Sequence, residues 1–253
     1  MADKPLRQLL KSDFGSSAPF ISDQQKGLPY PPLEVVAPDG AELIDLPPLQ
    51  DFAELTKADL FSLIKGRRSC RVFDKKGLSL QELAFLLWST AGVHEVVGEN
   101  YCTLRSVPSA GARHPIETYI AVRDVEGLES GGIYRYQPIE HQLFLVRKEE
   151  NLAELASAAA LQQRFVGRAA VTFYWVCVPY RSEWRYGPHS YKVDLLDGGH
   201  IAQNLYLAAE AIGCGTCAIA AYDQKECDSL LGVDGEDMFT IYLSPVGKKK
   251  VKK

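Results

Sequence analysis

A nearly continuous apolar and aromatic run, Ala169 to Val178, constrains the fold of this chain more than any other stretch. A run of this kind predicts a central strand that is buried on both faces. Alternating side chains from Ile116 to Val122 predict a second strand, and Gly132–Tyr136 with His141–Val146 predict a hairpin through Pro138. Because a hairpin breaks strict strand–helix alternation, we expect an α+β sheet with helices packed on it.

Four helices are predicted around these strands. A short one ends at Gly66, and Ser79 with Glu82 forms a capping box for a second that continues to Gly92. Asn151 is expected to cap an alanine-rich helix that reaches about Gln163. The fourth is a long helix from Asp194 to Ile212, which ends at Gly213. Two more strands are predicted after it, at Gly215–Ala221 and Met238–Leu243.

Composition excludes several classes of protein. The 253 residues carry a net charge of −4 with no basic stripe outside the last residues, so a nucleic-acid binder is not expected. No apolar run approaches the ~20 residues that span a bilayer, and Met1–Lys11 lacks the apolar core of a secretory signal. The six cysteines follow no disulfide spacing. We therefore expect a soluble, cytoplasmic protein.

Residues 1–55 form a proline-rich N-terminal arm. They hold eight of the fourteen prolines, which fix φ and remove hydrogen-bond donors. The arm should therefore be extended or irregular. Because it also contains apolar pieces such as Leu43–Leu46, we expect it to lie along a surface of its own subunit or of a partner.

Two motifs around residue 215 are not interpreted as functional. Gly213–Ala218 matches a dinucleotide fingerprint, but it follows a predicted helix and opens a strand, the reverse of what pyrophosphate binding requires. The same segment holds the pair Cys214 and Cys217, whose first thiol would sit at a helix C-terminus, where the helix dipole raises a thiol pKa. We interpret these cysteines as structural. The five histidines are scattered, and no metal is predicted.

Two further segments are candidates for ligand binding. Arg67-Arg68-Ser69-Cys70-Arg71 places three guanidinium groups and a hydroxyl within five residues, and guanidinium forks suit phosphate oxygens and carbonyl edges. Val107–Pro115 is a loop of small residues that leads directly into a predicted strand. Taken alone, the arginine segment is also compatible with a solvated basic turn.

Together, in this order and about forty residues apart, the two segments resemble the flavin-binding signature of the nitroreductase-like family of FMN enzymes. The loop, Pro-Ser-Ala-Gly-Ala followed by Pro115 and Glu117, looks most like the branch of the SagB/ThcOx-type azoline dehydrogenases. The resemblance runs from about Leu60 to Gly247. It implies a nitroreductase-like α+β fold, with a mixed or antiparallel sheet flanked by helices, and a homodimer with FMN at the interface. The FMN-binding domain would be residues 56–247, followed by a basic tail, 248–253.

The resemblance also implies site residues. The arginine segment would grip the phosphate, the ribityl chain and the pyrimidine edge of the flavin, with Arg71 near N1 and the C2 carbonyl. The small-residue loop would reach the other subunit's flavin, and the segment after the long helix would give backbone N–H groups to N5. Either Lys248 or Lys250 would reach the phosphate, the alternative being a solvated end. The implied cofactor-binding residues are thus Arg67, Arg68, Ser69, Arg71, Pro108, Ser109, Ala110, Gly111, Ile219, Ala220, Ala221 and Lys248.

The sequence departs from this branch in two places. Arg113 and His114 stand where the branch usually has apolar or aromatic residues. Arg185 and Tyr186 stand in the place of a Lys-Tyr pair that is associated with azole formation, and arginine is a poor general base. These four residues are candidates to shape a pocket for an anionic or polar substrate.

By resemblance, the expected function is FMN-dependent oxidoreduction by a ping-pong mechanism. A donor such as NAD(P)H would pass hydride to flavin N5 and leave, and a nitroaromatic, a quinone or a similar acceptor would then bind in the same place. Three alternatives remain open: dehydrogenation of a heterocycle in a modified peptide, a flavin- or peptide-binding module without turnover, and a structural subunit without flavin.

Overall fold

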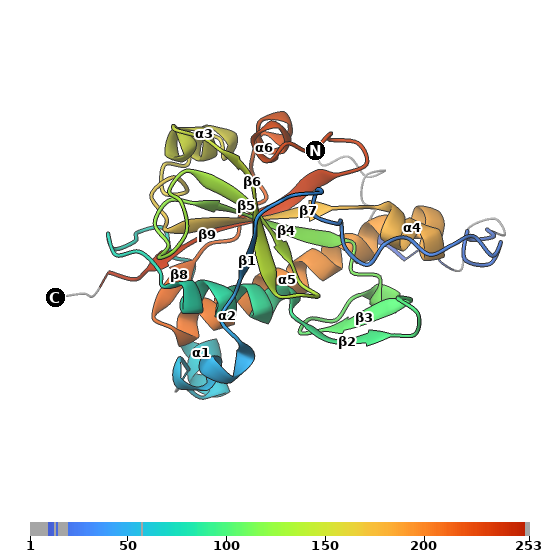
Figure 1. Cartoon of the computed structure of the whole chain (residues 1–253), viewed down its shortest axis with the longest axis horizontal. Coiled ribbons are helices and arrows are strands. Elements are labelled where there is room, and N and C mark those ends of the chain that lie inside the picture. The colour runs from blue at the N-terminus through green and yellow to red at the C-terminus, as the bar shows by residue number, and fades with distance from the viewer. Residues whose placement is uncertain (1–9, 13, 15–19, 57, 251–253) are drawn as a thin grey trace.

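A seven-stranded antiparallel sheet forms the centre of the computed structural model, which describes residues 10–12, 14, 20–56 and 58–250 (Figure 1). The strand order is β1-β6-β5-β4-β7-β9-β8, and every neighbouring pair runs antiparallel. The strands are β1 Leu43–Asp45, β4 Ile116–Val122, β5 Gly132–Gln137, β6 Gln142–Lys148, β7 Val171–Cys177, β8 Cys214–Thr216 and β9 Phe239–Lys248. A small separate hairpin joins β2 Val93–Val97 to β3 Cys102–Arg105. The α+β prediction is confirmed.

Helices cover both faces of the sheet, which explains the apolar run in β7. All seven residues of β7 are buried, and the strand lies between β4 and β9. Helices α2 Leu80–Ala91 and α5 Ser190–Ala211 pack on one face, and α3 Leu152–Ala159 and α6 Gln224–Leu231 pack on the other (Figure 1). Because neither face of β7 meets water, its sequence has no polar alternation.

The predicted capping box is confirmed. The Ser79 side chain accepts the Glu82 amide, and the Glu82 side chain accepts the Ser79 amide. The helix then buries Leu83, Leu86 and Leu87 against the sheet. Two amide groups at the start of α2 that have no carbonyl partner within the helix are therefore hydrogen-bonded by neighbouring side chains.

Other predicted helix boundaries were wrong. Asn151 makes no side-chain cap, and α3 ends at Ala159 because Leu161 and Gln162 adopt positive φ of 54° and 62°, which turns the chain. Gly66 is the last residue of α1 Leu60–Gly66 rather than a left-handed cap, since the C-cap is Arg67 with φ of −50°. Helix α5 begins at Ser190, four residues before the predicted start at Asp194.

The strand predictions near the C-terminus also need correction. The predicted strand 215–221 is reduced to β8, because the chain leaves the sheet after Thr216 and returns only through an isolated bridge between Ile219 and Leu243. Strand β9 is longer than predicted and reaches Lys248, so it enters the predicted basic tail. The hairpin β2–β3, helix α4 Tyr180–Tyr186 and helix α6 were not predicted.

The described part of the arm lies on its own chain. Strand β1 pairs with β6 at the edge of the sheet. Further along, the Val35 amide donates to the Glu117 carboxylate at 3.0 Å, and Arg135 Nη2 donates to the carbonyls of Val35 and Val36 at 2.8 and 2.9 Å. Glu117 is itself paired with buried Arg181. The arm is therefore fixed by buried charged groups rather than by apolar contact alone.

Replacing Ser79 with alanine should lower the free energy of unfolding by about 1 kcal/mol, because it removes an N-cap hydrogen bond. Ser89→Ala in the same helix is the matched control. The Ser89 hydroxyl bonds back to the Phe85 carbonyl, which remains in the helical ladder, so its loss should cost less. Denaturant unfolding measures both variants, and an equal effect of the two would contradict the capping role.

Candidate active site

The arginine segment lies across the ends of β8 and β9. The Cys70 amide donates to the Thr216 carbonyl and the Asp74 amide to the Lys248 carbonyl, both at 2.8 Å. These backbone bonds fix the segment, while Arg68, Ser69 and Arg71 stay exposed and Arg67 is half-buried. The sheet therefore holds the backbone and leaves the polar side chains available to a ligand.

Tyr206 in α5 joins this segment to the chain that follows β8. Its hydroxyl accepts the Ala218 amide at 2.9 Å and lies 3.0 Å from the Ser69 hydroxyl. The Arg67 guanidinium carbon is 5.2 Å from the centre of the Tyr206 ring. Tyr206 thus holds together two segments that are about 150 residues apart. The sequence pattern gave no signal for it, because it follows the buried Leu205 on an ordinary amphipathic helix.

The segment after β8 offers two free amides rather than three. The Ile219 amide donates to the Leu243 carbonyl at 2.8 Å, so the expectation that it serves a ligand needs correction. Within the described chain, the amides of Ala220 and Ala221 have no acceptor, and both residues are exposed. Nearby, Gln163 Nε2 donates to the Ala221 carbonyl at 3.0 Å.

We call Arg67, Arg68, Ser69, Arg71, Tyr206, Ala220 and Ala221 the arginine cluster. Arg71 marks its outer end, with its guanidinium carbon 5.9 Å from the centre of the Phe165 ring. Arg68 donates to the carbonyls of Lys65 and Arg67, which turns part of its guanidinium toward the backbone. Arg67 and Arg71 are therefore the more available cations.

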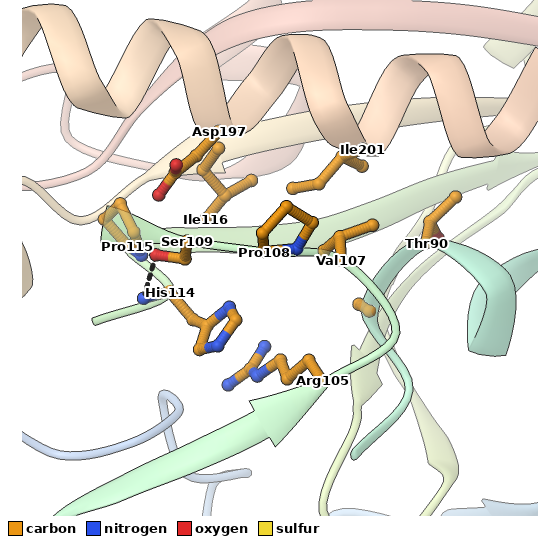
Figure 2. Close-up of a pocket in the computed structure, with 11 residues that line it drawn as sticks. Thr90, Arg105, Val107, Pro108, Ser109, His114, Pro115, Ile116, Asp197 and Ile201 are labelled. Carbon is orange, nitrogen blue, oxygen red and sulfur yellow. Dashed lines mark hydrogen bonds between the residues drawn. The ribbon is translucent and has the colours of Figure 1, made fainter. Parts of the chain in front are cut away.

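The small-residue loop is held by hydrogen bonds within it and by Asp197 of α5 (Figure 2). The Ala110 amide lies 3.3 Å from each carboxylate oxygen of Asp197 in α5, and the His114 amide donates to the Ser109 hydroxyl at 2.9 Å. Gly111 has φ of 58°, and a Cβ there would lie 2.5 Å from the Tyr186 hydroxyl. The positive φ therefore favours glycine at 111, and a larger residue would also have to displace the ends of the Tyr186 and Arg185 side chains.

Arg113 and His114 lie beneath the loop and are both almost completely buried. Arg113 donates to the carbonyls of Gly111 and Tyr101, and its guanidinium packs over the Tyr101 ring. The His114 ring bonds to the Thr103 carbonyl at 3.1 Å. This geometry makes both residues supports of the loop and turns them away from a ligand.

The cavity enclosed under the loop is too small for a cofactor. Figure 2 shows His114, Arg105, Pro108, Asp197 and Ile201 around it. Its volume of about 10 Å³ is room for about one water molecule. The loop is thus packed from below, and a ligand would have to meet its outer surface.

Arg185 and Tyr186 lie at the outer side of the loop, at the end of α4. Arg185 Nη1 is 3.3 Å from both Gln24 Oε1 in the arm and the Tyr101 hydroxyl. Tyr186 stands beside Gly111 and is half-buried. The residues Pro108, Ser109, Ala110, Gly111, Arg185 and Tyr186 form what we call the loop cluster.

The arginine cluster and the loop cluster are far apart on one chain. Helix α5 touches both, through Tyr206 and Asp197. These residues are nine positions apart, which corresponds to roughly 13.5 Å along the helix. On one chain the predicted site residues therefore form two separate groups, one beside Asp197 and one beside Tyr206.

Lys248 and Lys250 have different surroundings. Lys248 forms an ion pair with Glu82 of α2, and its neighbour Lys249 pairs with Glu210 of α5. Lys250 is exposed, and the part of the chain that the structure describes places no carboxylate beside it. Lys250 is thus the more available of the two candidates.

The arginine cluster has the chemistry that FMN requires. Phosphate needs guanidinium or ammonium groups, the ribityl chain needs hydroxyl or guanidinium partners, and the ring needs N–H donors beside small residues. Arg67, Ser69 and Arg71 meet the first two needs, and Ala220 and Ala221 meet the third. The residues fit the cofactor.

The two free cysteines that flank Gly215 and Thr216 are both buried. Cys214 and Cys217 are 0% and 2% exposed, and burial raises the pKa of the Cys214 thiol to about 12. A thiol with such a pKa is neutral and unreactive at neutral pH. Across the described residues, no group of three or more histidine, cysteine or acidic side chains could hold a metal ion.

Comparison with known proteins identifies the family. The model of the nitroreductase family matches residues 64–248. This chain belongs to the nitroreductase family of oxidoreductases. It is 36% identical over 201 residues to a protein of Methanocaldococcus jannaschii named as a putative nitroreductase, an alignment that covers 79% of this chain and 95% of that protein. The crystal structure of a putative nitroreductase from Ralstonia eutropha, 26% identical, superposes with a TM-score of 0.68 and covers 89% of this chain and 100% of its own.

A further relative is named for toxin processing, and a further solved structure shares the fold. The trifolitoxin-processing protein TfxB of Rhizobium leguminosarum is 34% identical over 134 residues, which is 51% of this chain and 36% of that protein. A chain of the Escherichia coli microcin synthetase McbBCD complex shares the fold, with a TM-score of 0.62 at 19% identity, covering 99% of this chain and 89% of its own. None of the helices in the described residues is long and apolar enough to span a bilayer.

His114→Asn should change how stability depends on pH. Burial, followed by the nearby Arg105 charge, lowers the pKa of His114 to about 3, whereas an unfolded histidine titrates near ~6.5. Between the two pKa values, the unfolded chain binds a proton at His114 that the folded chain does not bind. The contribution of the neutral imidazole to the free energy of unfolding is therefore complete above about pH 6.5. As the pH falls, this contribution is lost, and at about pH 5 the loss is about 2 kcal/mol.

Denaturant unfolding of wild type and His114→Asn at about pH 8 and about pH 5 measures this effect. Asparagine tolerates the positive φ at 114 but does not titrate. The stability difference between the two proteins should shift by about 2 kcal/mol in favour of the variant at the lower pH. Asp194, whose pKa burial raises to about 7, is present in both proteins and cancels. An unchanged difference would show that His114 titrates normally.

Proposed function

We propose that this protein is an FMN-dependent oxidoreductase that works by a ping-pong mechanism between a donor such as NAD(P)H and a small organic acceptor, a nitroaromatic or a quinone. Bound FMN would supply the two-electron chemistry. The chain would bind the cofactor, orient it and keep water away from its reactive face. Membership of the nitroreductase family and the donor set of the arginine cluster support this proposal.

The observation that carries the proposal is the double contact of the Tyr206 hydroxyl. It ties Ser69 of the arginine segment to Ala218, two residues before the free amides at 220–221. We assign Arg67 and Ser69 to the phosphate and ribityl chain, and Arg71 to the pyrimidine edge. A fixed positive charge there stabilises the reduced, anionic flavin and raises its potential.

We propose that the protein acts as a homodimer, with the loop cluster of one subunit completing the arginine cluster of the other. On one chain these clusters lie about nine residues apart along α5. If two α5 helices cross antiparallel near their midpoints, each loop cluster meets the partner's arginine cluster. Such an arrangement would form two identical sites across an isologous interface.

The exposed side of α5 supports this arrangement. Leu195 and Leu196, in the first third of the helix, are 64% and 52% exposed. Gly199 follows them, and a Cβ built on it meets nothing within 4 Å. Glycine costs about 1 kcal/mol relative to alanine inside a helix, and packing within the chain does not require it here. Close approach of a helix from another subunit would require a glycine at this position.

A complementary pair of surfaces also supports a second copy as the partner. Helix α1 exposes Leu60, Phe61 and Ile64 beside Lys65. A groove of about 680 Å³ at the start of α5 is lined by both apolar and acidic residues, among them Val178, Leu195, Phe239, Ile241, Glu183, Glu236 and Asp237. Apolar area and opposite charge on the two surfaces match each other.

A second candidate is dehydrogenation of a heterocycle in a modified peptide. The similarity to TfxB, a toxin-processing protein, favours it, and so does the place of Tyr186 beside Gly111 of the loop. Against it stands Arg185, because a guanidinium remains protonated and cannot accept the proton that azole formation releases. Turnover of NAD(P)H with a quinone, but of no azoline peptide, would decide for the first function.

Arg67→Gln and Arg71→Gln should each weaken FMN binding at least tenfold, because a hydrogen bond to a charged group contributes about 1.5–3 kcal/mol. Tyr206→Phe should also weaken it, since it frees Ser69 and Ala218 without changing the volume of the ring. Lys225→Gln, an exposed cation on α6, is the control. Flavin fluorescence on titration gives the Kd, and circular dichroism verifies folding. Unchanged Kd values in all three variants would remove the assigned site.

Gly199→Leu should dissociate the dimer and release FMN while the subunit stays folded. The chain has space for the new side chain, and leucine is the better helix former, so subunit stability should not fall. Glu154→Leu, which adds a leucine at an exposed position on α3, is the matched control. Light scattering gives the mass and absorbance gives the flavin content. A Gly199→Leu dimer with full flavin would contradict the proposed interface.

A further inference from the structure

A cavity of about 640 Å³ next to Arg71 is lined by an unusual concentration of cations. Its lining residues include Arg123 just after β4, Arg168 just before β7 and Lys250 just after β9, so it lies beyond the ends of these strands. Three separate stretches of chain and the start of the tail contribute to it. The charged lining residues are Arg71, Lys75, Arg123, Arg168, Lys250 and one acid, Asp74.

Four of these cations have no acidic partner. Throughout the described residues, no carboxylate lies within 4.0 Å of the charged groups of Arg71, Lys75, Arg168 or Lys250. Arg123 differs, with Asp124 at 3.8 Å. The adjacent lysines 248 and 249 are each paired with a glutamate.

The excess of positive charge is local. The whole chain has 28 basic and 32 acidic side chains, so composition alone would not gather unpaired cations around one hollow. Like charges that converge on a cavity raise the local positive potential and concentrate anions there. Guanidinium and ammonium groups around such a space match the oxygens of phosphate groups.

The cavity begins where the arginine cluster ends. Arg71 belongs to both, since it lines the cavity and its guanidinium also lies over Phe165. The other cations, Lys75, Arg123 and Arg168, have no place in the arginine cluster. A ligand that contacts the exposed edge of the flavin could therefore extend its charged groups into this second space.

We propose that this cavity is a second phosphate-binding site, which receives the phosphate groups of the nucleotide that reduces the flavin. The volume suits a pyrophosphate with part of a ribose better than a single small ion. The extra phosphate of NADPH would add a further contact, so NADPH is the preferred donor over NADH. The identity of the nucleotide rests on the proposed function; the binding of phosphate does not.

Calorimetric titration of the flavin-loaded protein with inorganic pyrophosphate and with 2′,5′-ADP tests the site directly. The double variant Lys75→Gln/Arg168→Gln should raise both Kd values roughly tenfold and leave the flavin content unchanged. Both side chains are exposed and make no hydrogen bond within the described chain, so folding should survive. Lys76→Gln is the matched control, because this exposed neighbour does not line the cavity and should behave as wild type.

Three results would overturn the site: no binding of either probe to the loaded protein, equal Kd values for wild type and the double variant, or loss of flavin from the double variant. The last would assign the cavity to the flavin's own phosphate.

Steady-state kinetics then tests the identity of the nucleotide. The double variant should raise the KM for NADPH about tenfold, with a smaller rise for NADH and unchanged kcat. An unchanged KM for NADPH, or a flavin that neither nucleotide reduces, would overturn the donor assignment while calorimetry still decides the phosphate site.

Discussion

The candidate site depends on the two hydrogen bonds of the Tyr206 hydroxyl. This hydroxyl holds Ser69 from the arginine segment and Ala218 from the chain after β8, and these two segments otherwise meet only at the ends of the sheet. Backbone contacts of Ser69 and Cys70 with Thr216 already join the two segments, and the Tyr206 hydroxyl adds a further bond at Ala218, two residues before the free amides. A preorganised set of donors binds a cofactor more tightly, because less conformational entropy is lost on binding.

Helix α5 links this cluster to the rest of the protein. One end carries Tyr206, and nine residues earlier Asp197 holds the small-residue loop, so the helix sets the spacing of two half-sites that do not meet on one chain. The exposed Leu195 and Leu196 lie just before Asp197, and the exposed Gly199 lies just after it. The proposed function therefore depends on an interface in which the partner subunit would complete the site.

Sequence reasoning identified the elements whose signal is local. The uninterrupted apolar run of β7 and the capping box at Ser79 each depend on neighbouring residues, and both predictions are confirmed. Features that depend on distant contacts were missed. Tyr206 looks like any partly buried helical tyrosine until Ser69 and Ala218 are placed beside it, and Ile219 is removed as a donor only by its pairing with Leu243. Arg113 and His114 read as pocket residues in sequence, yet the positive φ values of the loop turn them inward.

Complementation between two defective subunits tests the shared site most directly. One variant, Arg67→Gln/Arg71→Gln, removes the arginine cluster, and the other, Pro108→Glu, places a charge on the exposed outer surface of the loop. Each homodimer should bind little FMN. The heterodimer should bind about one FMN per two chains, because one of its two sites combines an intact arginine cluster with an intact loop. A heterodimer without FMN would show that each site is built within a single chain and would contradict the account.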